Sequence, residues 1–333
     1  MKISILMSFY NAEPFLTPCI QSILNQTESD WELIAVNDFA TDQSVQIIRR
    51  FAERDSRIKV LENTREGIVP ALQLALKHSS GQLITRMDAD DLMQPNKLKL
   101  MKTVLQQSGP GSVITCLVKY FSHEGPVGGG YLRYAEWLNN LTLKSHNFTE
   151  VYRECVIPSP AWMCYRSDLL AADAFHPEVY PEDYDLCFRF YRQKLKVIGL
   201  PQILHHWRDY PHRTSRTDAR YANPRFFALK VPWFNRLDRD SSRPLVLWGA
   251  GPTGKELAQH LTHSGNEFIW ITGNPTKHGK NIYGTVVQPE SILKSLKNPQ
   301  ILIAISAPEA QYEIEETLQI SRLKKGKDVF YFC

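Results

Sequence analysis

The chain has 333 residues, of which 43% are hydrophobic and 22% are charged, and its formal net charge at pH 7 is +4. This composition is ordinary for a soluble globular enzyme with room for two domains, and so small a net charge gives no reason to expect a nucleic-acid partner. No apolar stretch approaches the ~20 residues that a membrane-spanning helix needs. The six cysteines show neither Cys-x-x-Cys nor zinc spacing, so we expect reduced, buried thiols, as in the cytoplasm.

Predicted strands and helices alternate through the first hundred residues. Apolar runs predict strands at Ile3–Ser8, Trp31–Val36, Ile58–Leu61 and Leu83–Met87. Helical periodicity predicts helices from about Pro14 to Gln26, up to about Arg54, and up to about Gly81. This alternation implies an α/β fold with a doubly wound, mostly parallel sheet, whose ligand binds at the carboxyl ends of the strands.

Acidic residues follow the fourth of these strands at Asp88, Asp90 and Asp91. Carboxylates so close together repel one another unless a cation lies between them. At the open end of a parallel sheet the expected cation is Mg²⁺ or Mn²⁺, bound partly by protein oxygens and partly by substrate phosphates. A capping run for a helix at Asn96 is the alternative, and it would explain Asp91 but not the other two acids.

Several motifs, taken in order along the chain, resemble those of the family 2 glycosyltransferases, which have the GT-A fold. The motifs are Ser8-Phe9-Tyr10-Asn11-Ala12-Glu13, Val36-Asn37-Asp38, Met87-Asp88-Ala89-Asp90-Asp91, Glu182-Asp183-Tyr184-Asp185-Leu186 and Trp207-Arg208. The resemblance covers roughly residues 1–220, and the ordered set is far more specific than any single motif. It implies transfer of a sugar, mostly with inversion, from a nucleotide-diphosphate donor, in the first place a UDP-sugar, to a saccharide or lipid-linked acceptor.

Through this resemblance, Asp38 corresponds to the aspartate that hydrogen-bonds the base of the donor, and Arg65 to a position that lines the nucleotide. A carboxylate suits an imide N–H such as that of uracil. The glycine and serine that usually follow this aspartate are Phe39 and Ala40 here, so we expect a reshaped base pocket. Capping of the following helix is the alternative role for Asp38, and a solvated loop position is the alternative for Arg65.

The same resemblance makes Asp90 the main metal ligand, with Asp88 reaching the ribose or the metal. Relatives carry a histidine at the position of Tyr210. Either His212 replaces it as a metal ligand after a loop shift, or this chain has lost that ligand. The candidate ligands of the diphosphate are Arg208 and Arg213. A guanidinium binds phosphate oxygens bidentately. A solvated basic loop is the alternative for both arginines.

Glu182 and Asp183 open a predicted helix and match the acidic pair that supplies the family's catalytic base, with Asp183 at the position of the base itself. An inverting displacement requires a carboxylate that takes the proton of the acceptor on the side opposite the leaving group. The alternative is that both acids only favour the positive end of the helix dipole, which is a small electrostatic effect.

A glycine run, Gly128–Gly130, precedes Tyr131, Tyr134 and Trp137, which fall at helical spacing. Aromatic faces stack on sugars, so this helix is a candidate lining of the acceptor site. Packing of an amphipathic helix on the core is the other explanation of the same spacing.

We expect a GT-A domain over residues 1–237 and a small Rossmann-like domain over residues 244–333. The predicted elements of the second domain are strands at 245–248, 268–271 and 300–305 and a Gly-x-Gly-x-x-Gly turn at 249–254. They amount to one mononucleotide-binding half. Because Thr272-Gly273-Asn274 offers no carboxylate for an adenosine ribose, NAD(P) binding is not expected, and docking or dimerisation is the simpler role.

Two other functions remain open from the sequence. The first is an NAD(P)-dependent oxidoreductase that uses the glycine-rich turn, which would leave the acidic run unexplained. The second is a non-catalytic scaffold that binds sugar nucleotides. For the transferase we expect a cytoplasmic reaction, or one at the inner membrane face, in surface-polymer assembly. Basic residues between Arg189 and Arg243 suit a peripheral membrane contact, and a homodimer is also open.

Overall fold

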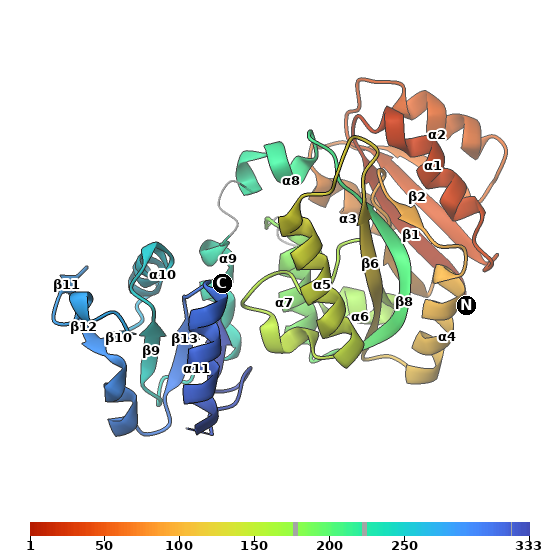
Figure 1. Ribbon diagram of the computed structural model, residues 1–333. Coiled ribbons are helices and arrows are strands. Elements are labelled where there is room, and N and C mark those ends of the chain that lie inside the picture. The colour runs from red at the N-terminus through yellow and green to blue at the C-terminus, as the bar shows by residue number, and fades with distance from the viewer. Residues whose placement is uncertain (176–178, 222–224, 321) are drawn as a thin grey trace. The chain divides into compact units, whose positions relative to one another are not determined.

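The computed structural model describes residues 1–175, 179–221, 225–320 and 322–333 (Figure 1). Contacts between residues divide the chain into two compact units. The larger unit consists of residues 1–147 and 156–222, and the smaller unit consists of residues 148–155 and 223–333. None of the helices in the described ranges combines the length and the apolar character that crossing a membrane requires.

An eight-stranded mixed sheet forms the centre of the larger unit, with the strand order β3-β2-β1-β4-β7-β6-β8-β5. Its strands are β1 Ile3–Phe9, β2 Trp31–Asn37, β3 Ile58–Glu62, β4 Leu83–Arg86, β5 Leu92–Met93, β6 Ser112–Phe121, β7 Trp162–Tyr165 and β8 Lys196–Arg208. β1 pairs in parallel with β2 and β4, and β2 with β3, which confirms the parallel arrangement predicted for the first hundred residues. β7 runs antiparallel to β4 and β6, whereas β6 and β8 are parallel.

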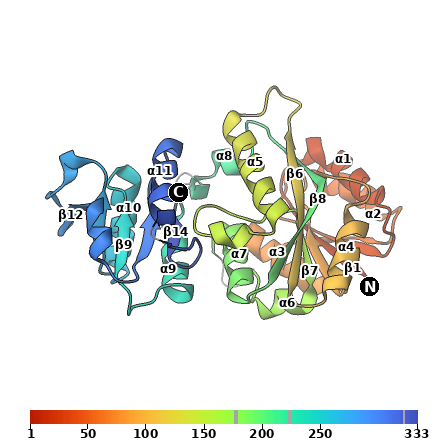
Figure 2. The same cartoon turned by 60° about the horizontal axis from the view of Figure 1, so that its bottom comes forward.

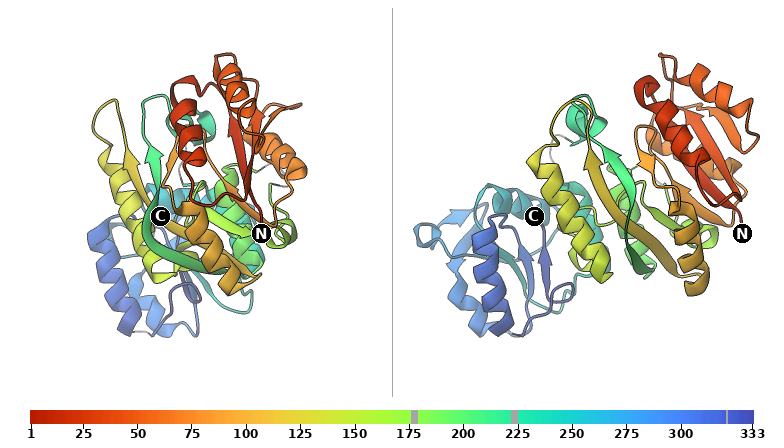
Figure 3. Two further views of the ribbon diagram at one scale, coloured as in Figure 1. Left: turned by 90° about the vertical axis from the view of Figure 1, so that its right-hand side faces the viewer. Right: turned by 45° about the vertical axis from the view of Figure 1, so that its right-hand side comes forward.

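Helices cover both faces of this sheet. They are α1 Glu13–Leu24, α2 Ser44–Ala52, α3 Ile68–His78, α4 Lys97–Ser108, α5 Gly129–Lys144, α6 Arg166–Ala171 and α7 Glu182–Arg192. A short helix, α8 Thr214–Thr217, follows β8. Alternate residues of β1, from Ile3 to Phe9, share one buried cluster with α1, α2 and α4, and α1 and α2 lie side by side on this face (Figure 3). α3 contacts β1 and β2 from the other face, as the right-handed crossover from β3 to β4 requires.

Helix α5 begins at Gly129, inside the glycine run. Its aromatic side chains are partly buried against the core cluster of the larger unit. The ring of Tyr131 lies 5.3 Å from that of Tyr120, and the ring of Tyr134 lies 6.3 Å from that of Trp207. These contacts support core packing, and not a sugar-binding surface, as the reason for the aromatic spacing.

The smaller unit contains a six-stranded sheet with the order β11-β12-β10-β9-β13-β14 (Figure 2). Its elements are α9 Phe227–Leu237, β9 Leu245–Trp248, α10 Pro252–His263, β10 Ile269–Thr272, β11 Asn281–Ile282, β12 Thr285–Pro289, β13 Gln300–Ile303, α11 Pro308–Ile320 and β14 Val329–Tyr331. Neighbouring strands are parallel except β11 with β12. If the five parallel strands are numbered 1 to 5 along the chain from β9, they lie side by side in the order 3-2-1-4-5, which is the order of a Rossmann-like sheet. The sheet extends beyond the single half expected, because β12 and β14 were not predicted.

The smaller unit also includes residues 148–155 and helix α9, so its boundary differs from the predicted boundary after residue 237. The ring of Tyr152 stacks on that of Phe332 at 5.3 Å and meets the ring of Phe234, on α9, edge-on at 5.6 Å. Lys230, also on α9, donates hydrogen bonds to the carbonyls of Arg153 (2.8 Å) and Phe332 (3.2 Å). The three segments therefore share one core, which periodicity along the chain does not reveal.

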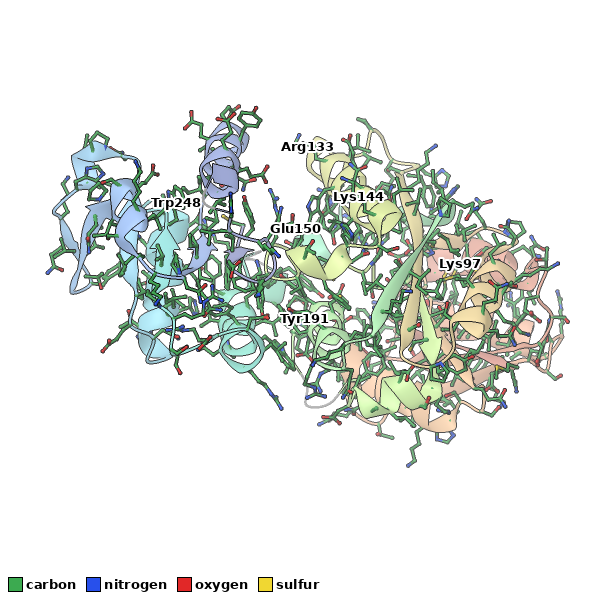
Figure 4. All side chains as sticks on the ribbon, turned by 90° about the horizontal axis from the view of Figure 1, so that it is seen from below. Lys97, Arg133, Lys144, Glu150, Tyr191 and Trp248 are labelled. Atoms are coloured by element: carbon green, nitrogen blue, oxygen red, sulfur yellow. The ribbon has the colours of Figure 1, made fainter. Side chains whose placement is uncertain are left out.

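The turn between β9 and α10 requires glycine at two positions. Gly249 has a φ of +124°, which side chains rarely allow, and a Cβ at Gly254 would lie 1.9 Å from the Gly249 carbonyl oxygen. A carboxylate does stand at the end of β10, contrary to expectation. Glu290 lies against Gly273 and accepts a 2.6 Å hydrogen bond from Nε1 of Trp248 (labelled in Figure 4). The sequence did not indicate this carboxylate at the end of β10, because Glu290 follows β12 in the chain.

Candidate active site

The carboxyl ends of β1, β2 and β4 meet at one edge of the larger sheet, because these strands are parallel neighbours. Phe9 is in register with Asn37, and Leu6 with Arg86, so the residues that follow each strand come together. The sequence-predicted residues at this edge are Asp38, Asp88 and Asp90. This is the edge at which doubly wound sheets bind their ligands.

Asp38 holds the loop that follows β3. Its carboxylate accepts hydrogen bonds from Asn63 Nδ2 (2.8 Å) and from the backbone N–H of Gly67 (2.9 Å), and the residue is 8% exposed. Asp38 does not cap α2, whose N-cap residue is Gln43, and the N–H of Ser44, which begins α2, donates to Asp42 at 3.0 Å. Arg65 lies in the loop that Asp38 holds, and its side chain is exposed. Asp38 therefore fixes the segment that carries the second predicted nucleotide residue.

Two exposed aromatic residues follow the same strands. Tyr10, after β1, is 59% exposed, and Phe39, directly after Asp38, is 49% exposed. Phe39 has a φ of +62°, a left-handed conformation that is unusual for a bulky side chain. An exposed ring on strained backbone beside a predicted ligand residue is typical of functional sites. The arrangement agrees with the expected reshaping of the base pocket.

Asp91 is fully buried in a polar network inside the larger unit. Its Oδ1 accepts from the Arg208 backbone N–H (2.8 Å), and its Oδ2 lies 2.9 Å from Nε2 of His205. Nδ1 of His205 lies 3.1 Å from Nζ of Lys97 (labelled in Figure 4). Because the lysine is the donor, Nδ1 accepts and Nε2 carries the proton that faces Asp91. Both oxygens of Asp91 are thus used within the fold, which leaves the other two acids of the run for a ligand.

Asp91→Asn is expected to destabilise the protein by about 1–3 kcal/mol, the cost of leaving a buried hydrogen-bonding group without a partner. Asparagine has a single acceptor oxygen for two donors, so its amide hydrogens would face either Arg208 N–H or His205 Nε2–H. The other histidine tautomer would place its proton against Lys97. Urea unfolding measures the loss. The matched control is Asp90→Asn, at a half-buried position, and an equally large effect there would contradict the network.

Asp88 and Asp90 are half-buried at the strand edge. Oδ1 of Asp88 accepts a 2.9 Å hydrogen bond from Nε of Arg86. Burial and the nearby Asp91 carboxylate raise the pKa of Asp90 to about 7, and the guanidinium of Arg213 opposes that rise. The fold therefore concentrates negative charge at this point, where a bound cation would be favoured.

Within the described ranges, no three His, Cys, Asp or Glu side chains come close enough to hold a metal ion. His212 is exposed, so the predicted set of Asp88, Asp90 and His212 is not assembled in this structure. At the place of the family histidine stands Tyr210, and burial, followed by the charge of the Asp90 carboxylate, raises the pKa of its hydroxyl. Carboxylate oxygens suit Mg²⁺ or Mn²⁺, and two carboxylates fit a cation whose other ligands are water and substrate oxygens.

The two predicted diphosphate arginines lie in different settings. Arg208 is 4% exposed, with its guanidinium 4.9 Å from the ring of Phe15 and 4.5 Å from that of Phe121. Its Nε donates a 2.6 Å hydrogen bond to the Asp90 carbonyl, so it fixes the acidic loop. Arg213 is half-buried, and its charge acts on the Asp90 carboxylate. Arg213 is thus the better placed of the two to meet a phosphate, and phosphate binding by either stays a prediction.

Glu182 and Asp183 begin α7, as predicted. Glu182 is buried, and its Oε1 accepts a 2.8 Å hydrogen bond from Nη1 of Arg86. Asp183 is half-buried, and its Oδ1 accepts from the Tyr184 backbone N–H at 2.8 Å. Burial, and after it the charge of Glu182, raises the pKa of Asp183 to about 7, while Arg86 opposes the rise. A carboxylate with such a pKa can take up a proton near neutral pH.

Sequence reasoning did not single out Arg86, which joins the two acidic segments. It lies at the end of a short apolar strand and belongs to none of the motifs considered above. A charged residue at the last position of a buried strand, two residues before an acidic run, is the signal that would have indicated it, because a buried charge needs a partner.

The chain matches known proteins over the same region. The model of glycosyl transferase family 2 matches residues 4–171. An uncharacterised glycosyltransferase of Haemophilus influenzae is 28% identical over 232 residues, which cover 64% of this chain and 67% of that protein. The Escherichia coli protein WfgD, a UDP-Glc:alpha-D-GlcNAc-diphosphoundecaprenol beta-1,3-glucosyltransferase, is 38% identical over 104 residues, which cover 31% of this chain and 40% of WfgD.

Two solved structures share the fold. TarS 1–349 of S. aureus, in complex with UDP-GlcNAc, has a TM-score of 0.56 at 17% identity, over 78% of this chain and 72% of that one. The mannosyltransferase PcManGT from Pyrobaculum calidifontis, in complex with GDP-Man and Mn²⁺, has a TM-score of 0.52 at 18% identity, over 79% and 69%. At these identities the likeness shows the GT-A fold alone.

Proposed function

The chain belongs to glycosyl transferase family 2, and on that basis we propose that it is an inverting, metal-dependent transferase. It moves a sugar from a nucleotide-diphosphate donor to a hydroxyl of a saccharide or lipid-linked acceptor. The proposed donor is a UDP-sugar. The observation that carries this proposal is Asp183, a half-buried carboxylate with a pKa near neutrality, within electrostatic reach of Asp88. Such a group suits general base catalysis beside a site for a charged donor.

Donor binding is assigned to the edge formed by β1, β2 and β4. Asp38 accepts a hydrogen bond from the imide N–H of the base, for which uracil is suitable. Arg65 and Asp88 contact the nucleotide, and the exposed rings of Tyr10 and Phe39 close the base pocket. The bound UDP-GlcNAc in the TarS complex supports a UDP-sugar, because that protein shares this fold.

Asp183 acts as the base in the proposed reaction. It takes the proton from the acceptor hydroxyl while the oxygen forms a bond to the anomeric carbon. The bond from that carbon to the diphosphate oxygen breaks on the opposite face, and the electron pair leaves with the nucleoside diphosphate. Glu182 is already engaged by Arg86, so it supports the base and does not replace it. General base catalysis of this kind contributes about 10²–10⁴-fold.

Asp88 and Asp90 are the residues that would hold a divalent cation. When bound, Mg²⁺ or Mn²⁺ neutralises the negative charge that grows on the departing nucleoside diphosphate. Arg213 adds a second positive charge for the diphosphate, and Arg208 acts mainly by fixing the Asp90 loop. His212 would complete the ligand set only after its loop moves toward the acids. The Mn²⁺ in the PcManGT complex supports a metal here.

We place the reaction in the cytoplasm or at the inner membrane face, in the assembly of a surface polymer. The six cysteines are free thiols, the state that a reducing compartment maintains. The name of WfgD includes a diphosphoundecaprenol substrate, which supports a lipid-linked acceptor for this chain as well. The smaller unit is assigned to docking or dimerisation, because Glu290, the carboxylate at the end of β10, already accepts a hydrogen bond from Trp248.

A panel of nucleotide sugars, with and without Mn²⁺, tests the proposal. We expect metal-dependent release of nucleoside diphosphate from one donor, with UDP-sugars turned over in preference to GDP-sugars. Donor binding without release, across the panel and with saccharide acceptors added, would instead indicate the binding scaffold. Micromolar binding of NADH or NADPH to the full chain, with no donor turnover, would instead support the NAD(P)-dependent oxidoreductase function.

A further inference from the structure

Arg86 joins two acidic segments that lie far apart in the sequence. It is the last residue of β4, and its side chain is 7% exposed. Nε donates to Oδ1 of Asp88 at 2.9 Å, and Nη1 donates to Oε1 of Glu182 at 2.8 Å. One guanidinium thus connects the donor side of the site, after β4, to the first turn of α7, which carries the base.

Glu182 depends on this contact. Its side chain is 4% exposed, and within the described residues its second oxygen, Oε2, has no hydrogen-bond partner. A buried carboxylate without a cation is strongly unfavourable, because it has lost its hydration and gained nothing in return. The Arg86 guanidinium is therefore the cation that pairs with the buried Glu182 carboxylate.

Asp183 lies in a different setting from its neighbour. It is half-buried, and Oδ1 accepts from the backbone N–H of Tyr184. Arg86 acts on Asp183 through space but hydrogen-bonds Glu182 and Asp88. Of the two acids that begin α7, one is therefore held by the arginine and the other is left for the substrate.

We propose that Arg86 is a positioning residue that pairs with Glu182 to hold the first turn of α7, and with it Asp183, against the donor-binding edge of the sheet. This inference rests on the proposed transferase function, since it assigns Asp183 as the base. Arginine suits the role because its planar fork donates in two fixed directions at once. Lysine is a flexible point charge and cannot hold both carboxylates in one geometry.

A double-mutant cycle tests the inference, with Arg86→Met, Glu182→Gln and the combination of both. All variants are assayed at a temperature where thermal unfolding shows them folded. Arg86→Met should lower kcat by about 10²-fold, the effect of a small misplacement of a reacting group. Glu182→Gln keeps the shape of its side chain and an acceptor oxygen, so its loss should stay below about tenfold.

The combined variant gives the sharpest result. It contains no unpaired Glu182 carboxylate, so its kcat should recover at least about tenfold relative to Arg86→Met. The donor KM should be raised in Arg86→Met and equally raised in the combined variant, because in both Asp88 has lost its Arg86 partner. Arg86→Lys should retain charge but recover less than half of the wild-type kcat. A merely structural role would not separate kcat from KM in this way.

Three outcomes would overturn the inference. One is a combined loss of kcat equal to the product of the single losses, and another is full activity of Arg86→Lys. The third is a loss in Glu182→Gln as large as that in Asp183→Asn, which would make Glu182 the base. If the wild-type protein turns over no donor, the proposed function fails. The melting temperatures of the wild-type protein and the three variants of the cycle then test the pairing by themselves. The combined variant should melt at a higher temperature than Arg86→Met, and additive decreases from the two single substitutions would contradict the pairing.

Discussion

Replacing Asp183 with asparagine is expected to lower kcat by at least ~10²-fold while the affinity for the donor stays nearly unchanged. Asparagine keeps the shape of the side chain and its acceptor oxygen for the Tyr184 N–H. It cannot take up a proton near neutral pH, and general base catalysis usually contributes about 10²–10⁴-fold. Single-turnover release of nucleoside diphosphate, together with a calorimetric titration of the donor, separates the two effects. Asp173→Asn, at an acid whose side chain is 58% exposed, is the matched control.

The pH dependence gives an independent check on the same residue. Burial, and then the Glu182 charge, raises the pKa of Asp183 to about 7. The base works only when it is deprotonated, so kcat should rise as pH increases through about 7 and then level off. In Asp183→Asn this rise should disappear, leaving a low rate with little pH dependence. Near-normal turnover in that variant, with the rise intact, would transfer the role to Glu182 or Asp185.

Much of the larger unit could be predicted from the sequence, because its signals are local. Buried strands such as Ile3–Phe9 are short apolar runs, and helices such as α2 keep a 3.6-residue period. Since the strands are parallel, residues that follow them are bound to meet at one edge, whichever helices lie between. Asp38, Asp88 and Asp90 were therefore placed together without any knowledge of contacts.

What the sequence did not indicate depends on contacts between distant segments. The role of Arg86 depends on α7 lying beside β4, because its partner Glu182 is on α7. Arg208 cannot be told from a solvated basic residue by its sequence neighbours, because Phe15 and Phe121 enclose it only in the folded chain. Glu290 reaches the end of β10 only because β12 is its neighbour in the sheet. Such partners come together only in the folded chain, and no spacing along the sequence predicts them.

Replacing Asp90 with alanine is expected to remove the dependence of nucleoside-diphosphate binding on divalent cations. Even the loss of an outer partner of a metal ligand usually costs about 10–100-fold in affinity, so the loss of the main ligand should exceed ~10²-fold in Mn²⁺. The fold should survive. Burial and Asp91 raise the pKa of Asp90 to about 7, so the ionised carboxylate is disfavoured in the folded protein and its removal relieves repulsion.

Calorimetric titration of UDP with Mn²⁺ and with a chelator separates the metal from the other contacts. In the chelator, the wild-type protein and Asp90→Ala should bind UDP equally weakly, because the contacts of the base with Asp38 do not involve the cation. In Mn²⁺ the wild-type protein should gain affinity and Asp90→Ala should not, whereas Asp183→Asn should gain as much as the wild type, since it keeps both Asp88 and Asp90. An unchanged gain in Asp90→Ala would show that Asp88 holds the cation without it. A reduced affinity in the chelator as well would mean that Asp90 contacts the nucleotide directly.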